Sequence, residues 1–347
     1  MKKFKELFAK VRQFDIYKNK RIFYIVPLFV ILVMLICGMC YQFSNTKQYF
    51  ANIGIDFQGG TILTIEFKDS EANSEKYDQN LAVIKEVLNE QGVSVSRDQK
   101  SGDSTIIVQY VNFKKGEGSN DAKEMNIVNQ TIKDNLRDKS ANGEISTILT
   151  INDTTIGNTS SKNLLKTAAI AVAVARACML LYIIIRFDLY SALATIVALL
   201  HDLIIMLSLS VIFYVEIGDS IVAALITIVA YSINNTIVVF DKIRTNVKPY
   251  KQSKTSYNVK DIVNTSIFGT MTRTIYTTFT TLVVMIILVA IGVASIRTFG
   301  LPIIFGLIAG FYSSVFIAAP LWADFKSIGA KLGQSRKNRK YKKAHSK

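Results

Sequence analysis

The sequence predicts a polytopic α-helical membrane protein with six transmembrane helices and one α+β domain outside the membrane. Half of the 347 residues are hydrophobic, and the mean hydropathy is +0.29. Six apolar stretches are each long enough to cross the hydrocarbon core of a bilayer, which takes about 20 residues. The polar segment 43–163 separates the first stretch from the other five. These observations are typical of a membrane protein with one sizeable polar domain.

The net charge of +15 is unevenly distributed along the chain. Basic residues outnumber acidic ones in the segments 1–21, 241–261 and 323–347, whereas acidic residues are in the majority in 43–163. Basic segments that flank apolar spans on alternate sides follow the positive-inside pattern and contact anionic lipids. A nucleic-acid-binding protein would instead concentrate them in a folded domain. We therefore expect membrane lipids and no nucleic acid as partners, with both termini in the cytoplasm.

The chain begins with a basic amphipathic segment, 1–21, which is expected to lie along the cytoplasmic membrane surface. The segment 22–42 is expected to form the first transmembrane span. Its apolar run is too long for the core of a signal peptide, and no small-residue cleavage site follows it. The sequence therefore predicts a retained anchor with its amino end inside.

The segment 43–163 is predicted to fold as the extracytoplasmic domain. Gly59 and Gly60 allow a tight or bulged backbone before the alternating strand 61–67. Apolar residues at helical spacing predict two amphipathic helices, and alternating or apolar runs predict further strands. The helices are expected at 75–90 and 121–139, and these strands at 93–96, 105–113 and 145–151. The order βαββαβ predicts a ferredoxin-like α+β fold.

The segment 164–322 contains the five remaining spans. They are predicted at 165–185, 191–214, 221–244, 270–293 and 299–321. The short links 186–190 and 215–220 make the second, third and fourth spans neighbours. In the sixth span, Gly306 and Gly310 form a small-residue face for contact with another helix. The basic tail 323–347 is expected in the cytoplasm.

Three ionisable residues fall at or near membrane depth, namely Arg176, Asp202 and Arg273. Such residues are rare, usually paired, and candidates for an ion path. Asp202 is the only acid among them and could bind a proton reversibly. Alternatively, Asp202 forms a static ion pair with Arg176 or Arg273, or a hydrogen bond to a serine or asparagine. The structural alternative for Arg176 is a tolerated packing residue, and for Arg273 a side chain that extends to the membrane surface. His201 is expected on a different helix face from Asp202, in a structural role.

The fourth span carries polar groups in its middle: Tyr231, Ser232, Asn234, Asn235 and Thr236. Exposing these groups to lipid would be costly, so we expect them to face other helices or a wet cavity. A functional site and simple hydrogen bonding between helices both explain them.

Few residues in the chain suit enzymatic or metal chemistry. Cys37, Cys40 and Cys178 all lie in predicted spans, and the only histidines are His201 and His345. We find no spacing typical of a metal site, phosphate loop or nucleophile–base pair. The sequence therefore predicts no enzyme, no metal and no bound cofactor.

Several stretches together resemble the SecF family. They are GIDFQGGT (54–61), HD (201–202), YSINNTIVVFDKIR (231–244), TRTIYTTFTTL (272–282) and GFYSSVFIAAPLW (310–322). The resemblance makes Gly54, Asp56, Gly59 and Gly60 the family motif of the outer domain. It implies an RND-type bundle in the bacterial inner membrane. It also implies the partners SecD, the SecYEG translocon, possible contact with YajC, and preprotein substrates, with a transported H⁺ or Na⁺ driving export.

The resemblance also indicates a departure at the expected ion site. The family carries an aspartate in the fourth span and an arginine in the fifth; here Asn235 and Arg273 occupy those positions. Arg176 is also unusual, because the family has an apolar or small residue there. Three explanations compete: Asp202 acts with an acid of the partner, neutral oxygen ligands including Asn235 bind Na⁺ although Arg273 nearby disfavours a cation, or coupling is weakened and a scaffold role remains. Half of an RND-type exporter is a more distant alternative.

Overall fold

A computed structural model describes residues 15–44, 49–68, 74–101, 104–111, 122–291 and 294–345. Most of the predicted amphipathic segment 1–21 lies outside these residues. The chain forms two compact units. We call Ile53–Ala171 with Glu216–Ser220 the sheet unit, and Met1–Asn52, Val172–Val215 and Ile221–Lys347 the helical unit.

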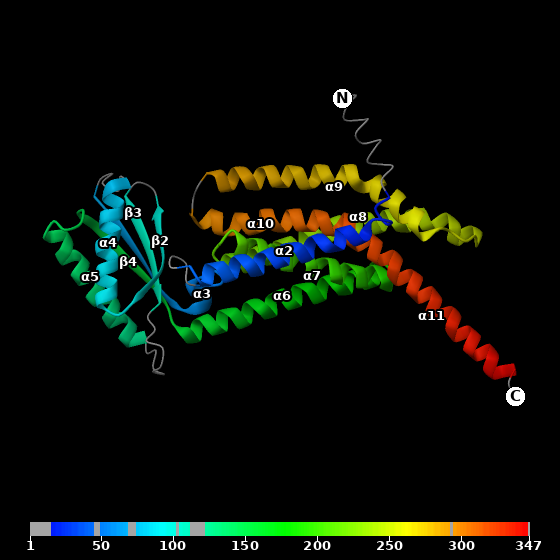
Figure 1. Cartoon of the computed structure of the whole chain (residues 1–347), viewed down its shortest axis with the longest axis horizontal. Helices are drawn as coiled ribbons and strands as arrows, with labels where there is room; N and C mark the ends of the chain where they lie inside the picture. The colour runs from blue at the N-terminus through cyan, green and yellow to red at the C-terminus, as the bar shows by residue number, and fades with distance from the viewer. Residues whose placement is uncertain are drawn as a thin grey trace, which may run out of the picture. The chain divides into compact units, whose positions relative to one another are not determined.

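Six helices in the described chain are long and apolar enough to cross a membrane, which agrees with the number of predicted spans. The first five are α2 (Lys20–Gln42), α6 (Asn158–Arg186), α7 (Leu189–Ile212), α8 (Asp219–Ser253) and α9 (Val259–Ala290). The sixth is continuous through α10 (Ala294–Ser313), the π-helical turn η1 (Ser314–Ala318) and α11 (Ala319–His345) (Figure 1).

Helices α8 and α9 continue well beyond the apolar runs that predicted them. Asn246 donates its side-chain amide to Ser266 Oγ at 2.9 Å, and Val247 and Val263 are buried. The two helices therefore keep packing after their surfaces have become polar. A hydropathy pattern cannot detect this extension, because it responds only to runs of lipid-spanning length.

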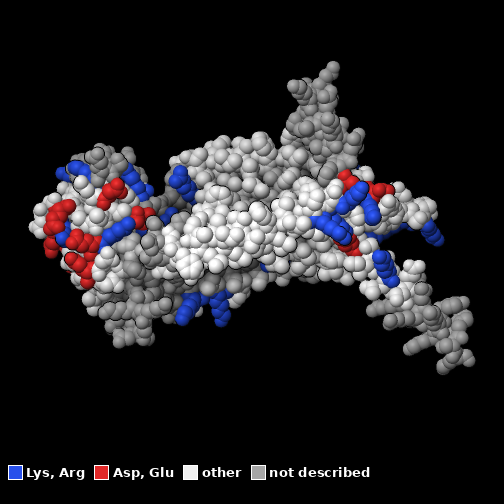
Figure 2. Space-filling view, in the orientation of Figure 1, with Lys and Arg blue, Asp and Glu red and all other residues white. Residues whose placement is uncertain are grey.

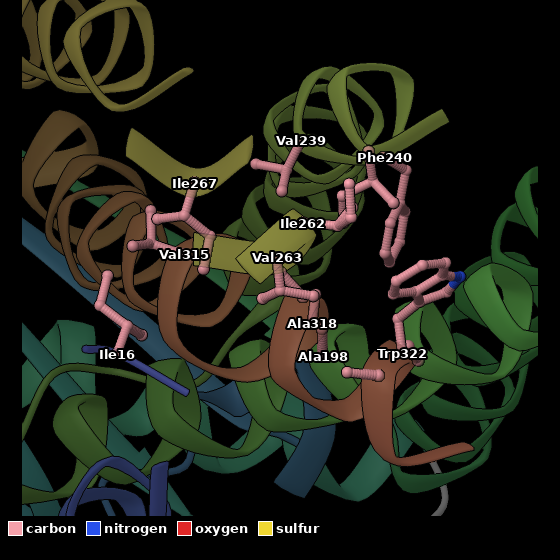
Figure 3. Packing of buried hydrophobic residues seen from close by; sticks show 14 of the residues in the cluster. Ile16, Ala198, Val239, Phe240, Ile262, Val263, Ile267, Val315, Ala318 and Trp322 are labelled. Atoms are coloured by element: carbon pink, nitrogen blue, oxygen red, sulfur yellow. The ribbon is translucent and has the colours of Figure 1, made fainter. Parts of the chain in front are cut away.

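The core of the helical unit collects small and branched side chains from several helices. Figure 3 shows Val239 and Phe240 of α8 facing Val263 of α9 and Trp322 of α11. Trp322 is 3% exposed, and Phe240 is 2% exposed. On the face seen in Figure 2, the middle of the bundle is largely uncharged, and charged residues gather at the end that carries the last turns of α8.

The sheet unit contains a four-stranded antiparallel sheet in the order β2-β3-β1-β4. The strands are β1 (Gly60–Phe67), β2 (Ser94–Ser101), β3 (Thr105–Val111) and β4 (Ile148–Ile156), and the helices are α3 (Ile55–Gln58), α4 (Ser74–Glu90) and α5 (Ala122–Ala141). Alternate residues of β1 and β3, including Leu63 and Val108, are fully buried with Ile84 of α4 and Ile132 of α5. Both long helices therefore cover one face of the sheet.

Candidate functional site

The candidate site is built around Asp202, which α7 holds inside the helical unit with only 1% of its surface exposed. Ser232 of α8 donates its hydroxyl to Asp202 Oδ2. The other carboxylate oxygen, Oδ1, lies 3.0 Å from His201 Nδ1. An acidic group this far from solvent needs such partners, because an unpaired buried charge is costly. The structure thus shows the predicted alternative of a hydrogen bond to a serine, and within the described chain it shows no ion pair of Asp202 with Arg176 or Arg273.

His201 belongs to this site, and the expectation that it lies on a separate helix face is wrong. Neighbouring residues on a helix are about 100° apart, which is too much for most side chains to meet. Here the imidazole stacks on the ring of Tyr312, with centroids 5.9 Å apart and an interplanar angle of 20°. This stacking orients the ring so that Nδ1 reaches Asp202. The adjacent HD pair was the only sequence signal for the contact.

Asn235 lies one turn beyond Ser232 on the buried face of α8. Its side-chain Nδ2 has no hydrogen-bond partner among the described residues, although Asn235 is only 3% exposed. The hydroxyl of the neighbouring Thr236 is also unpartnered there. Helical spacing places residues 232, 235 and 236 on one side. Asn234 faces away and is exposed, so the structure separates the two predicted asparagines.

Two contacts show that α9 packs antiparallel to α8. Asn246 pairs with Ser266, and a Cβ on Gly269 would lie 3.1 Å from Lys242 Cε. Farther along α9, Thr278 has a buried hydroxyl without a partner in the described chain.

Neither predicted arginine lies in the Asp202 cluster. Arg273 is exposed on α9 and forms no ion pair within the described residues. Arg176 is half-buried on α6, and its Nε and Nη2 have no hydrogen-bond partner in the described chain. Asp202 of α7 thus contacts the buried face of α8 that also carries Asn235, whereas neither arginine forms a hydrogen bond or ion pair with Asp202 in the described chain.

Gly306 and Gly310 of α10 allow close approach to α8, which supplies Ser232 and Asn235. A Cβ on Gly306 would lie 2.4 Å from Ile228 Cγ1, which real structures do not tolerate. A Cβ on Gly310 would lie 3.1 Å from the Ser232 Cβ. Small residues at these two positions therefore determine how closely α10 covers the site.

The glycine motif of the sheet unit has a separate, structural geometry. Gly54 donates its backbone N–H to the carbonyl of Ile217 at 3.0 Å, and Gly59 closes α3 with a φ of 78°. Gly60 has a φ of 140°, and a Cβ there would lie 2.5 Å from the carbonyl oxygen of Tyr110. Only glycine fits such a position, so the motif forms the turn that starts β1.

Asp56 of the same motif anchors the loop before α8. Its Oδ2 accepts a hydrogen bond from the backbone N–H of Asp219 at 3.1 Å. Burial raises the pKa of Asp56 above its ordinary value. Glu216 of this loop pairs with Arg97 of β2 and accepts from Gln109 Nε2 at 3.2 Å. Sequence reasoning missed Arg97 and Glu216, because nothing in their spacing indicates that they meet.

The arrangement gives the Asp202 carboxyl group two polar neighbours. The Ser232 hydroxyl and the His201 imidazole can each donate or accept a hydrogen bond. Asn235 can donate and accept hydrogen bonds but cannot change charge. Within the described residues, no group of three or more His, Cys, Asp or Glu could hold a metal ion.

The sequence matches two family profiles. Residues 136–328 match the family described as protein export membrane protein SecD/SecF, C-terminal, and this region is more than half of the chain. Residues 52–71, which contain the glycine motif, match the SecD/SecF GG motif.

Similar proteins carry the name protein translocase subunit SecF. The protein from Acidaminococcus fermentans is 33% identical over 320 residues, which cover 91% of this chain and 98% of that protein. The protein from Rickettsia bellii is 29% identical over 312 residues, or 90% of this chain and 93% of that protein.

The structure is similar to solved structures of SecDF. The crystal structure of SecDF from Thermus thermophilus, described as a translocon-associated membrane protein, is 27% identical with a TM-score of 0.67. It covers 90% of this chain, which spans only 39% of that longer chain. SecDF in its super-membrane-facing form is 25% identical with a TM-score of 0.60, covering 93% of this chain and 40% of its own.

Proposed function

We propose that this chain uses an ion gradient to assist protein export. The premise is that the chain belongs to the SecD/SecF family of protein-export membrane proteins, as a SecF-type translocase subunit. The observation that carries the proposal is Asp202. It is an acid buried in a membrane bundle, and it contacts two side chains that can follow a change in its protonation. Intramembrane acids of this kind are functional by default, because burying them is costly.

The energy available to such a site is sufficient to move a domain. One charge that crosses a membrane releases about 2.3 kcal/mol per 100 mV of potential. About 5.5 kcal/mol shifts a two-state equilibrium from roughly 1:99 to 99:1. A few ions per cycle can therefore drive such a change. Protonation of Asp202 would alter its hydrogen bond with Ser232 and thereby the packing of α7 on α8.

The remaining parts of the proposal follow from the family. The partners are SecD, which supplies a further acid, the SecYEG translocon with YajC, and unfolded preproteins. The protein lies in the bacterial inner membrane with both termini in the cytoplasm. The βαββαβ sheet unit is a ferredoxin-like extracytoplasmic domain. The chain is a transport subunit and not an enzyme. It transports H⁺ or Na⁺ and needs no cofactor.

The test is preprotein translocation into inverted membrane vesicles that contain the SecDF complex, with and without an imposed ion gradient. We expect Asp202→Asn to lose most of the gradient-dependent fraction of translocation while the ATP-dependent fraction remains. Asp138→Asn, the same chemical change at an exposed aspartate of the sheet unit, is the matched control and should behave like the native protein. Equal gradient dependence in Asp202→Asn and the native protein would make Asp202 structural.

The second candidate function is a scaffold that stabilises SecD and the translocon without coupling to ions. Asn235 favours it, because an amide stands where the family places an ionisable aspartate. The same assay separates the two functions through Asn235→Asp. If the native protein shows no gradient dependence and Asn235→Asp creates it, the scaffold role is supported. If Asn235→Asp only changes an existing dependence, the coupled function is supported.

A further inference from the structure

The helical unit contains a cavity of about 280 Å³ between the α6–α7 turn, α8 and α11. We call it the basic pocket and define it by the four cationic side chains that line it. These are Arg186 of α6, Arg244 and Lys251 of α8, and Lys326 of α11. The ion-path proposal uses none of these residues.

The basic pocket has an excess of positive charge. Its only lining acid, Asp188, already accepts hydrogen bonds from the Ser191 hydroxyl and from Trp322 Nε1, the latter at 3.2 Å. None of the four cations forms an ion pair with an acidic side chain in the part of the chain that the structure describes. Four positive charges and one negative charge give the pocket a net charge of +3.

The floor of the pocket is apolar. Phe240 and Val247 line it and are 2% and 3% exposed. The Trp322 indole lies next to the pocket, with Lys326 Nζ 4.5 Å from its ring centroid. Figure 3 shows the rings of Phe240 and Trp322 facing each other at this position. An apolar floor with a cationic rim suits a molecule that has one anionic end and one apolar end.

The location of the pocket indicates where that molecule comes from. Arg186 is the last residue of α6, and Arg244 follows the point at which the apolar run of α8 gives way to Asp241 and Lys242. Both mark the boundary between the hydrocarbon core and water. Phospholipid headgroups occupy this depth, and basic pockets between helix ends bind anionic headgroups.

We propose that the basic pocket binds the phosphate headgroup of an anionic phospholipid. The volume is close to the lower limit of about 300 Å³ for small-molecule sites, so it holds a headgroup and not a whole lipid. The acyl chains then extend outside the pocket, along the apolar surface of the bundle. Arg244 and Lys251 lie about two turns apart on the same face of α8, and they provide charge-assisted hydrogen bonds to the phosphate.

The chain contains a single tryptophan, Trp322, which provides a direct readout. The full chain is reconstituted in phosphatidylcholine vesicles that contain a small fraction of phosphatidylglycerol with brominated acyl chains. Bromine quenches indole fluorescence only at close range. We expect brominated phosphatidylglycerol to quench Trp322 at a lower mole fraction than brominated phosphatidylcholine. Equal quenching by the two lipids would overturn the proposal.

Two matched variants test the pocket itself. Arg244→Gln with Lys251→Gln removes two exposed cations from the rim, and we expect half-maximal quenching to need about thirty-fold more phosphatidylglycerol. Lys248→Gln with Lys254→Gln removes the same charge from the same segment outside the pocket and should leave the preference unchanged. Equal losses in both variants would mean general surface attraction and would overturn the site.

Inorganic phosphate distinguishes the lipid from a free anion. If the lipid headgroup is the ligand, millimolar phosphate at constant ionic strength leaves the quenching by phosphatidylglycerol unchanged. If phosphate displaces the lipid where the same concentration of sulfate does not, the pocket is a site for soluble phosphate and the lipid assignment is wrong.

Discussion

Asn235 and Asp202 differ in what their side chains can do. The amide of Asn235 stays neutral, whereas the carboxyl group of Asp202 can ionise. The resemblance places Asn235 where the family has an acid, yet its side chain is neutral and its amide nitrogen has no partner in the described chain. Asp202 is the ionisable residue of the two and has partners on α7 and α8. This placement makes Asp202 the first residue to change when coupling is tested.

Gly60 gives a prediction about backbone geometry. Gly60→Ala combines a φ that alanine rarely adopts with a Cβ 2.5 Å from the Tyr110 carbonyl oxygen. We expect the sheet unit to lose about 2 kcal/mol or more of stability, which hydrogen exchange of β1 measures. Gly143→Ala is the control, because its φ is 76° with nothing within 4 Å. Equal losses in both variants would show that the close contact with the Tyr110 carbonyl oxygen is not the cause.

Asp56 gives a prediction about pH. Burial raises its pKa in the folded state, so the folded state binds the proton more tightly than the unfolded state does. The contribution of Asp56 to stability therefore falls as the pH rises from about 4 toward neutral. Asp56→Asn cannot ionise, so its unfolding temperature relative to the native protein should rise over this range. If the difference in unfolding temperature between Asp56→Asn and the native protein is the same at both ends of this pH range, the Asp56 carboxyl group does not cause the pH dependence.

At the scale of elements, the contact between α8 and α10 controls the geometry around Ser232. Helices in a membrane gain little from hydrophobic burial, so close packing through small residues holds them together. Gly306 and Gly310 provide this packing against Ile228 and Ser232. A change in the separation of the two helices would therefore move the hydroxyl that contacts Asp202.

Gly306→Ala tests this contact. The added methyl would lie 2.4 Å from Ile228 Cγ1, so the Ile228 side chain or the helices must shift. We expect a loss of about 1–3 kcal/mol, measured as the resistance of the purified chain to thermal unfolding in detergent. Combining it with Ile228→Ala should restore part of the loss, because the smaller side chain makes room. Additive losses in the double variant would show that the two positions do not interact.

At the scale of the whole molecule, the helical unit is suited to lipid and not to water. Its outward side chains include Leu28 of α2, Leu181 of α6 and Phe279 of α9, which are 60% or more exposed. Apolar surface of this extent is stable only when a bilayer or another protein covers it. The chain is accordingly a multi-pass membrane protein, and its charged segments lie at the helix ends.

Single cysteines test the orientation of the chain. With Cys37, Cys40 and Cys178 replaced by serine, we introduce Glu144→Cys in the sheet unit or Lys254→Cys after α8; both positions are exposed. A membrane-impermeant maleimide added to intact cells should label position 144, and label position 254 only after the cells are permeabilised. The reverse pattern would place the basic segments outside and contradict the positive-inside assignment.

The sequence by itself determined the six spans, the alternation of strands and helices in the polar segment, and the residues that chemistry could use. These features depend on local hydropathy and periodicity, which act over one helix or strand. Gly54, Gly60 and Asp56 were likewise visible as a motif, although their contact with the loop at Ile217 and Asp219 was not.

Only the tertiary structure decided which side chains meet. The contact between His201 and Asp202 depends on stacking against Tyr312, more than a hundred residues away along the chain. The exposure of Arg273 and the basic pocket depend on how helices distant in sequence pack. A single sequence carries no record of such distances, because each side chain's direction is set by neighbours that its local pattern does not specify. Asp202 therefore acquired its partners from the fold, whereas its presence in the membrane was evident from the sequence.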